Sequence, residues 1–227
     1  MNITLYGDSI LKGVLLEEGK YKMNRSWEQR LAAEHGVVIR NRARFGCTIG
    51  KALGLIEKDC AAHWPEGELA LLEFGGNDCD FDWAAVAAEP HRQHQPKVML
   101  KRFVQQYNAL IDSVKKMNIR PVILSMPVID PDRFFETVSF GLNRDNILQW
   151  LGGRTIRISH WHEMYNLELF KLARQRDVPI VDITSPFLEQ ADYNDYLCAD
   201  GIHPNERGHA LIAEVLMSKA KDFPGLR

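Results

Sequence analysis

The sequence has little of what marks several classes of protein. Its formal net charge is −2, so bulk charge gives no sign of a nucleic-acid partner or of binding to a membrane surface. No apolar run approaches the ~20 residues that a membrane-spanning helix needs. The chain also lacks an internal repeat, a low-complexity tract and a linker that would divide it. We therefore expect one domain over residues 1–227, with no nucleic-acid partner and no membrane span.

Cysteine is scarce and scattered. No Cys-x-x-Cys pair occurs among Cys47, Cys60, Cys79 and Cys198. This spacing predicts reduced thiols and no disulfide framework. The N-terminus has the pattern of a strand, not the basic segment and apolar run of a secretory signal. We therefore expect a cytoplasmic protein.

What the sequence does contain is an alternation of strand and helix patterns. This is typical of an α/β fold with a parallel sheet between two layers of helices. A chain of this length, with 45% hydrophobic residues, can bury a core of that kind. The expected strands are residues 2–6, 37–39, 69–74, 121–126 and 179–183. The expected helices are residues 25–35, ended by Gly36; 48–62, capped by Thr48; one opened by Pro96; one carrying Trp161 and Tyr165; and about 204–221. We expect loops at 12–24 and 79–95.

The first candidate for chemistry is the end of the first expected strand, where Gly7, Asp8 and Ser9 follow one another. Gly7 can adopt the tight turn that ends a strand. Ser9 would then lie at the carboxyl end of the sheet, where open α/β sheets bind their ligands. A serine there is a candidate nucleophile, although glycine, aspartate and serine are also common turn residues.

Two other strand ends carry candidate donors to an oxyanion. After residues 69–74, Gly75 and Gly76 lead into Asn77, whose side-chain amide can donate to an oxyanion or belong to a simple turn. After residues 37–39, the backbone N–H of Gly46 can donate in the same way. The alternative is that Gly46 is present only because the turn requires glycine.

The most informative segment precedes the last expected helix. Asp200 and His203 are three residues apart across a glycine turn, so both side chains can reach the same side. A carboxylate at that distance can hold one imidazole nitrogen and leave the other free as a base. The alternative is a turn with an exposed histidine.

In this order, Gly7-Asp8-Ser9, Gly46, Gly75-Gly76-Asn77-Asp78 and Asp200-x-x-His203-Pro204 resemble the four motif blocks of the GDSL/SGNH hydrolase superfamily. The resemblance implies a flavodoxin-like three-layer α/β/α sandwich with a five-stranded parallel sheet in the order 2-1-3-4-5. It also implies Ser9 as nucleophile, His203 as general base and acid, and Asp200 as its orienting carboxylate. The implied oxyanion hole consists of the backbone N–H groups of Ser9 and Gly46 and the side chain of Asn77. No cofactor is implied.

Two details of this assignment leave alternatives. Gly50 is a second candidate for the glycine of the second block, but Gly46 follows the strand more closely. The pairs His160 and His162, and His91 and His94, could suggest a metal. Histidines two apart point to different sides of a helix, and no cysteine joins either pair at a zinc spacing, so we expect no metal site.

The segment after the fourth expected strand, about 127–157, is a long insertion. It is much longer than the usual connection of about 4–6 residues, and it begins at the same edge of the sheet as Ser9. We interpret its aromatic residues as the wall of an acyl pocket. In the alternative, they only pack the insertion onto the body. The residues concerned are Phe134, Phe135, Trp150 and, at the start of the next helix, Trp161.

These features predict a serine esterase that acts through an acyl-enzyme on small-molecule esters with short acyl groups, acetylated carbohydrates among them. One alternative is a lysophospholipase or thioesterase acting on longer acyl chains. Others are an acyltransferase and a binding protein on the same fold without catalytic activity.

Overall fold

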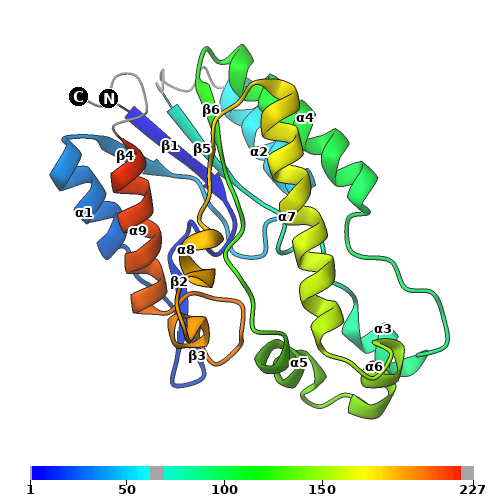
Figure 1. The fold of residues 1–227 in the computed structure, drawn as a ribbon. Coiled ribbons are helices and arrows are strands. Elements are labelled where there is room, and N and C mark those ends of the chain that lie inside the picture. The colour runs from blue at the N-terminus through cyan, green and yellow to red at the C-terminus, as the bar shows by residue number, and fades with distance from the viewer. Residues whose placement is uncertain (1, 62–68, 221–227) are drawn as a thin grey trace.

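The computed structural model describes residues 2–61 and 69–220 and shows a parallel sheet between two layers of helices (Figure 1). The sheet order is β4-β1-β5-β6-β7, which is the predicted order 2-1-3-4-5 when the extra strands β2 and β3 are left aside. Its strands are β1 (Asn2–Gly7), β4 (Val38–Asn41), β5 (Leu69–Glu73), β6 (Arg120–Leu124) and β7 (Ile180–Val181). The predicted fold class is confirmed. Residues 62 and 221, which we expected in helices, lie outside the described residues, as do both ends of the expected domain.

Helices cover both faces of the sheet. On one face lie α2 (Ile49–Ala61), α4 (Leu100–Lys116) and α7 (Ile156–Arg176). On the other lie α1 (Ser26–His35), α8 (Ser185–Leu188) and α9 (Glu206–Ala220). Because side chains alternate across a strand, β1 contributes Leu5 to the core beneath α1 and α9 and Tyr6 to the core beneath α2 and α4.

Two helix starts differ from expectation. The helix expected to open at Pro96 begins at Leu100. The last helix begins at Glu206, because Pro204 is held by an isolated bridge to Leu197. The prediction for Gly36 is confirmed: it ends α1 in the left-handed conformation, with φ 61°.

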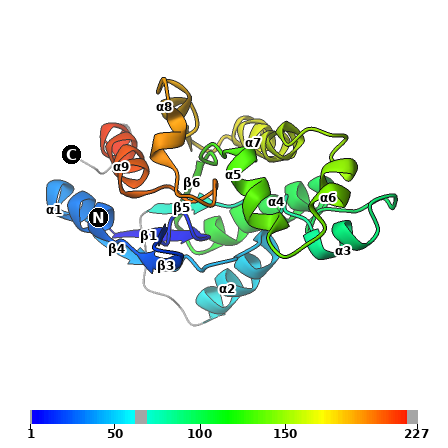
Figure 2. The ribbon, with the colours of Figure 1, turned by 90° about the horizontal axis from the view of Figure 1, so that it is seen from below.

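The expected loop at 12–24 is instead a β-hairpin, at the carboxyl edge of the sheet (Figure 2). Its strands are β2 (Val14–Glu17) and β3 (Lys20–Met23). The Val14 N–H donates to the Ser9 carbonyl at 2.9 Å, and the Val14 carbonyl accepts from His209 Nε2 at 3.1 Å. All of β3 is exposed, so the hairpin has no apolar periodicity that the sequence could reveal.

Short helices build up the rest of this edge. The expected loop at 79–95 contains α3 (Trp83–Ala88), whose N-terminus is capped by Asp82. The insertion at 127–157 folds into α5 (Pro131–Ser139) and α6 (Arg144–Trp150) before it enters α7. A short 3₁₀ helix covers Tyr193–Tyr196. An aromatic and aliphatic cluster fills the space among α3, α5 and α6.

Candidate active site

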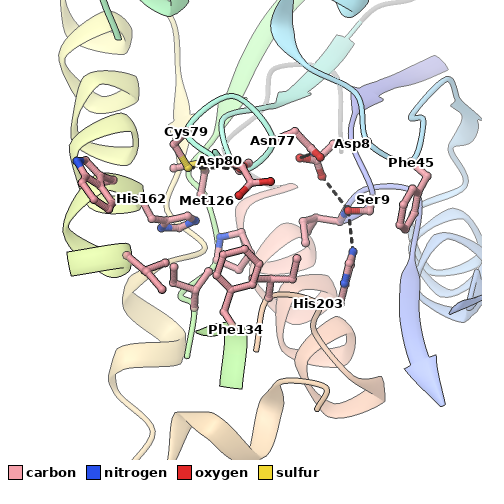
Figure 3. A pocket seen from close by; sticks show the side chains of 18 of the residues that line it. Asp8, Ser9, Phe45, Asn77, Cys79, Asp80, Met126, Phe134, His162 and His203 are labelled. Carbon is pink, nitrogen blue, oxygen red and sulfur yellow. Dashed lines mark hydrogen bonds between the residues drawn. The ribbon is translucent and has the colours of Figure 1, made fainter. Parts of the chain in front are cut away.

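The structure brings Ser9, His203 and Asp200 together at the carboxyl edge of the sheet. Figure 3 labels Ser9 and His203. His203 Nε2 lies 2.9 Å from Ser9 Oγ, and His203 Nδ1 lies 2.7 Å from Asp200 Oδ2. All three side chains are buried. The carboxylate selects Nδ1 as the protonated nitrogen, which leaves Nε2 able to accept the proton of Ser9.

The turn after β1 places Ser9. The Asp8 carboxylate accepts the N–H of Ile10 at 2.9 Å, and the Lys12 N–H donates to the Asp8 carbonyl at 3.1 Å. We expected glycine at position 7 because it can adopt a tight turn, but Gly7 does not have a positive φ. A Cβ at this position would lie 2.9 Å from Leu11 Cβ, so the close approach of Leu11 is what favours glycine.

A second turn places Asp200 and His203. Gly201 has φ 76°, and a Cβ there would lie 2.6 Å from the carbonyl oxygen of Asp130, just before α5. The Asp200 carboxylate accepts the backbone N–H groups of Ile202 and His203. Burial disfavours its charge, but the hydrogen bond and charge of His203, with these N–H groups, outweigh burial and lower the pKa of Asp200. Asp200 therefore stays ionised at neutral pH and can stabilise an imidazolium.

Two aromatic rings that were not predicted from the sequence cover the imidazole. Phe45 stacks on His203 with ring centroids 5.9 Å apart, and Tyr21 of β3 meets its edge at 5.2 Å. Burial, foremost, and the nearby Asp200 carboxylate raise the pKa of Tyr21. With both rings in place, His203 is only 3% exposed. Phe45 could have been found as the neighbour of Gly46, whereas Tyr21 lies on the hairpin that gave no signal.

The three predicted oxyanion donors line one cavity with Ser9 Oγ. Within residues 2–61 and 69–220, neither the Ser9 nor the Gly46 backbone N–H donates a hydrogen bond. Asn77 Nδ2 donates to Asp8 Oδ2 at 2.9 Å, and its second hydrogen remains for another acceptor. Gly50, the alternative for the second block, lies in α2 and is not among the residues that line the cavity.

A carboxylate from the Asn77 segment ties these donors together. Asp78 Oδ1 accepts the first N–H of α2, that of Ile49, at 3.0 Å. We expected Thr48 to cap this helix; its backbone carbonyl accepts from Ala52, but the side-chain cap is Asp78. Burial raises the pKa of Asp78 to about 7. This link holds the start of α2, next to Gly46, against the turn that carries Asn77.

The cavity in front of Ser9 has a volume of about 210 Å³. Two of the four aromatic residues predicted to bind substrate, Phe134 and Trp161, line it (Figure 3 labels Phe134). Phe81 and Trp83, in the segment expected to be a loop, line it as well.

The other two predicted wall residues do not line the cavity. Phe135 follows Phe134 in α5, so its side chain points into the buried cluster behind the wall. Trp150 stacks on Trp161, with ring centroids 5.0 Å apart. Both residues therefore support the wall from behind.

His162 of α7 lies on the far side of the cavity from Ser9 (Figure 3). Its Nδ1 is 3.5 Å from Glu163 Oε1, and this contact lowers the pKa of Glu163. His160, His91 and His94 do not line the cavity. Across the described parts of the chain, no three His, Cys, Asp or Glu side chains gather in a way that could hold a metal ion. No helix in the same parts combines the length and apolar character needed to cross a membrane.

Known proteins resemble this chain over most of its length. The GDSL esterase/lipase WDL1 of Oryza sativa subsp. japonica is 22% identical over 184 residues, which are 80% of this chain and 64% of that protein. The structure of a lipase/acylhydrolase from Enterococcus faecalis has a TM-score of 0.64 at 17% identity, covering 97% of this chain and 95% of that one. The psychrotrophic esterase EstA from Pseudoalteromonas sp. has a TM-score of 0.63 at 18% identity, covering 97% of each chain.

At these identities the solved structures show a shared fold. The family itself is shown by a sequence model that matches residues 5–211, a range that contains every residue assigned to the site above. The chain therefore belongs to the GDSL-like lipase/acylhydrolase family.

Proposed function

We propose that this protein is a serine ester hydrolase that cleaves small-molecule esters with short acyl groups. The observation that carries the proposal is the continuous hydrogen-bonded chain from Asp200 through His203 to Ser9 at the wall of a cavity. Ser9 Oγ attacks the ester carbonyl while His203 Nε2 takes its proton, and His203 then protonates the leaving alcohol. Water hydrolyses the acyl-enzyme by the same route.

The negative charge that develops on the carbonyl oxygen needs fixed donors. The N–H groups of Ser9 and Gly46 and the amide of Asn77 can supply them. They come from three separate segments held together by the sheet and by Asp78. Because they are in place before substrate binds, they need little reorganisation during the reaction.

The aromatic wall supports a short acyl group. Phe81 contacts Trp161 with ring centroids 4.7 Å apart, and Trp83 contacts Phe134 at 6.2 Å, so the rings close one side of the cavity. A closed wall leaves room for an acetyl group and clashes with a long chain. An open groove would instead gain about 0.8 kcal/mol for each buried CH₂.

Polar groups in the same cavity extend the proposal to acetylated carbohydrates. Asp80 lines the cavity and is held by Trp83 Nε1 at 2.8 Å and Lys97 Nζ at 2.7 Å. His162 lines it as well. Both side chains suit an alcohol that carries hydroxyl groups.

The first test measures acyl-chain preference. We expect kcat/KM to fall from acetyl through butyryl to octanoyl esters of 4-nitrophenol, and Phe134→Ala or Trp161→Ala to flatten that fall by opening the wall. Phe140→Ala is the matched control, because Phe140 lies in the same insertion and is 90% exposed. A parent that prefers octanoyl esters would favour the lysophospholipase or thioesterase alternative.

The second test concerns the nucleophile. Ser9→Ala should fold and lose at least about 10⁴-fold in kcat, and a phosphonate should label Ser9 in the parent. Full activity in this variant would refute the mechanism. Acyl transfer to an added sugar in preference to water would indicate an acyltransferase. A parent protein that shows neither esterase activity nor phosphonate labelling would favour the binding-protein alternative.

A further inference from the structure

A buried glutamate lies within the site and has no part in the reaction described above. Glu73 is the last residue of β5 and pairs in register with Gly7 of β1, which places it beside Asp8. Glu73 is 1% exposed and Asp8 is 2% exposed, and both line the cavity. Their carboxyl groups lie within hydrogen-bonding reach of each other.

Two buried carboxyl groups in contact cannot both be ionised at low cost, so they share a proton. Asp8 is the better place for the negative charge, because its two oxygens accept from the Ile10 N–H and from Asn77 Nδ2. Glu73 Oε2, by contrast, has no hydrogen-bond partner among residues 2–61 and 69–220. Burial and the Asp8 charge accordingly raise the pKa of Glu73 well above its ordinary value.

We propose that Glu73 is a positioning residue, whose carboxylic acid donates to the Asp8 carboxylate so that Asp8 holds the Asn77 amide toward the oxyanion. This inference rests on the proposed function, because it takes Asn77 as an oxyanion donor. Asp8 accepts one N–H of Asn77 and thereby sets the direction of the other. By staying neutral, Glu73 also keeps a second negative charge away from the oxyanion.

The proposal predicts an alkaline loss of activity that depends on Glu73. When Glu73 loses its proton, Asp8 loses a donor and a second carboxylate faces the oxyanion. The other titratable groups that interact with the pair are His203 before α9, Cys47 before α2, Asp78 and Cys79 after β5, and Tyr107 in α4. All of them remain in Glu73 variants, so a difference between parent and variant reports on Glu73.

The activity experiment compares Glu73→Gln, which keeps a donor but has no proton to lose, with Glu73→Met, which keeps the length without a donor. At neutral pH we expect Glu73→Gln to retain kcat within about 3-fold and Glu73→Met to lose about 10-fold or more, with KM little changed in both. Glu73→Gln should also lack the alkaline fall of the parent. Asp59→Asn is the matched control, because Asp59 is a buried carboxylate outside the cavity that bonds to Tyr6 and Arg42.

A second experiment detects the proton without any substrate. If folded Glu73 keeps its proton, unfolding at pH 7 should release about one proton more from the parent than from Glu73→Gln. The slope of the unfolding free energy against pH, from urea titrations, measures this difference. Asp59→Asn should keep the slope of the parent.

The outcomes separate this proposal from the proposed function. An extra proton together with the kcat pattern above supports the role of Glu73. Equal proton release from parent and Glu73→Gln would overturn the shared proton. If the parent releases the extra proton but Glu73→Gln and Glu73→Met both keep its kcat and pH profile, the positioning role is overturned. The proposed function would still stand in that case, because the parent is active. A parent that neither hydrolyses esters nor reacts with a phosphonate would overturn both.

Discussion

Three buried acidic side chains near Ser9 differ in charge because their neighbours differ. His203 and two backbone N–H groups keep Asp200 ionised in spite of its burial. Glu73 faces Asp8 and has an unpartnered oxygen, so it is held neutral. Asp78 is intermediate, because burial raises its pKa to about 7 while the Ile49 N–H favours its charge. At the scale of single residues, the partners decide which of these groups is ionised beside His203, which caps a helix and which holds a proton.

The prediction at this scale concerns Asn77. Asn77→Ala should lower kcat by about 10²–10³-fold with a smaller effect on KM, because the lost donor acts mainly in the transition state. Steady-state kinetics on an acetyl ester measures this. Asn146→Ala is the control, since Asn146 donates to the Ala87 carbonyl and does not line the cavity. A change in KM alone would assign Asn77 to substrate binding.

At the scale of elements, the β2–β3 hairpin covers the proposed catalytic residues. It is tied to the Ser9 carbonyl through Val14 and to α9 through His209. Its second strand carries Tyr21, which contacts both His203 and Asp200. A segment without a hydrophobic core of its own thus shields the proposed base from solvent and places a hydroxyl near its carboxylate.

The hairpin prediction separates the ring of Tyr21 from its hydroxyl. Tyr21→Phe keeps the ring and loses the hydroxyl near Asp200, so we expect kcat to fall about 3–10-fold, as loss of about 1 kcal/mol would give. Tyr21→Ala also exposes His203 and should lose more. Met23→Ala, at an exposed position of the same strand, should match the parent. Equal kcat values for Tyr21→Ala and the parent would exclude a role for the hairpin in catalysis.

At the scale of the whole molecule, histidine burial links stability to pH. His209 of α9 is buried, and burial lowers its pKa from 6.5 to about 4. Above pH 6.5 the folded and unfolded states both hold it neutral, and it adds no pH dependence. As the pH falls below 6.5, the unfolded state takes up a proton that the folded state refuses, so stability is lost progressively toward pH 4.

The parent should therefore lose on the order of 3 kcal/mol more of its unfolding free energy between pH 7 and pH 4 than His209→Gln does. Glutamine has no titration in this range and keeps an N–H donor for the Val14 carbonyl. Urea titrations at a series of pH values provide the comparison. Other acid-sensitive groups are common to both proteins and cancel. Equal losses of unfolding free energy in the parent and in His209→Gln would contradict the lowered pKa of His209.

Much of the fold could be predicted because the central strands are short apolar runs and α4 repeats apolar residues at helical spacing. The prediction failed for elements without such a pattern. The hairpin is exposed along β3, and α3 is too short to show a helical period. The cap of α2 was also missed, because Asp78 is 29 residues from Ile49 in the chain and adjacent only in the fold.

The same limit applies to the site. Ser9, Asn77 and His203 could be proposed from the sequence, because local turns and strand ends place them and their motifs occur in a recognisable order. The remaining features depend on which segments come together in space. The Tyr21 and Phe45 cover over His203, the pairing of Asp8 with Glu73, and the choice of Phe134 over Phe135 as a wall residue all required the tertiary structure. The physical reason is that burial and long-range contacts arise only when distant segments pack together, and these contacts set charge, accessibility and orientation.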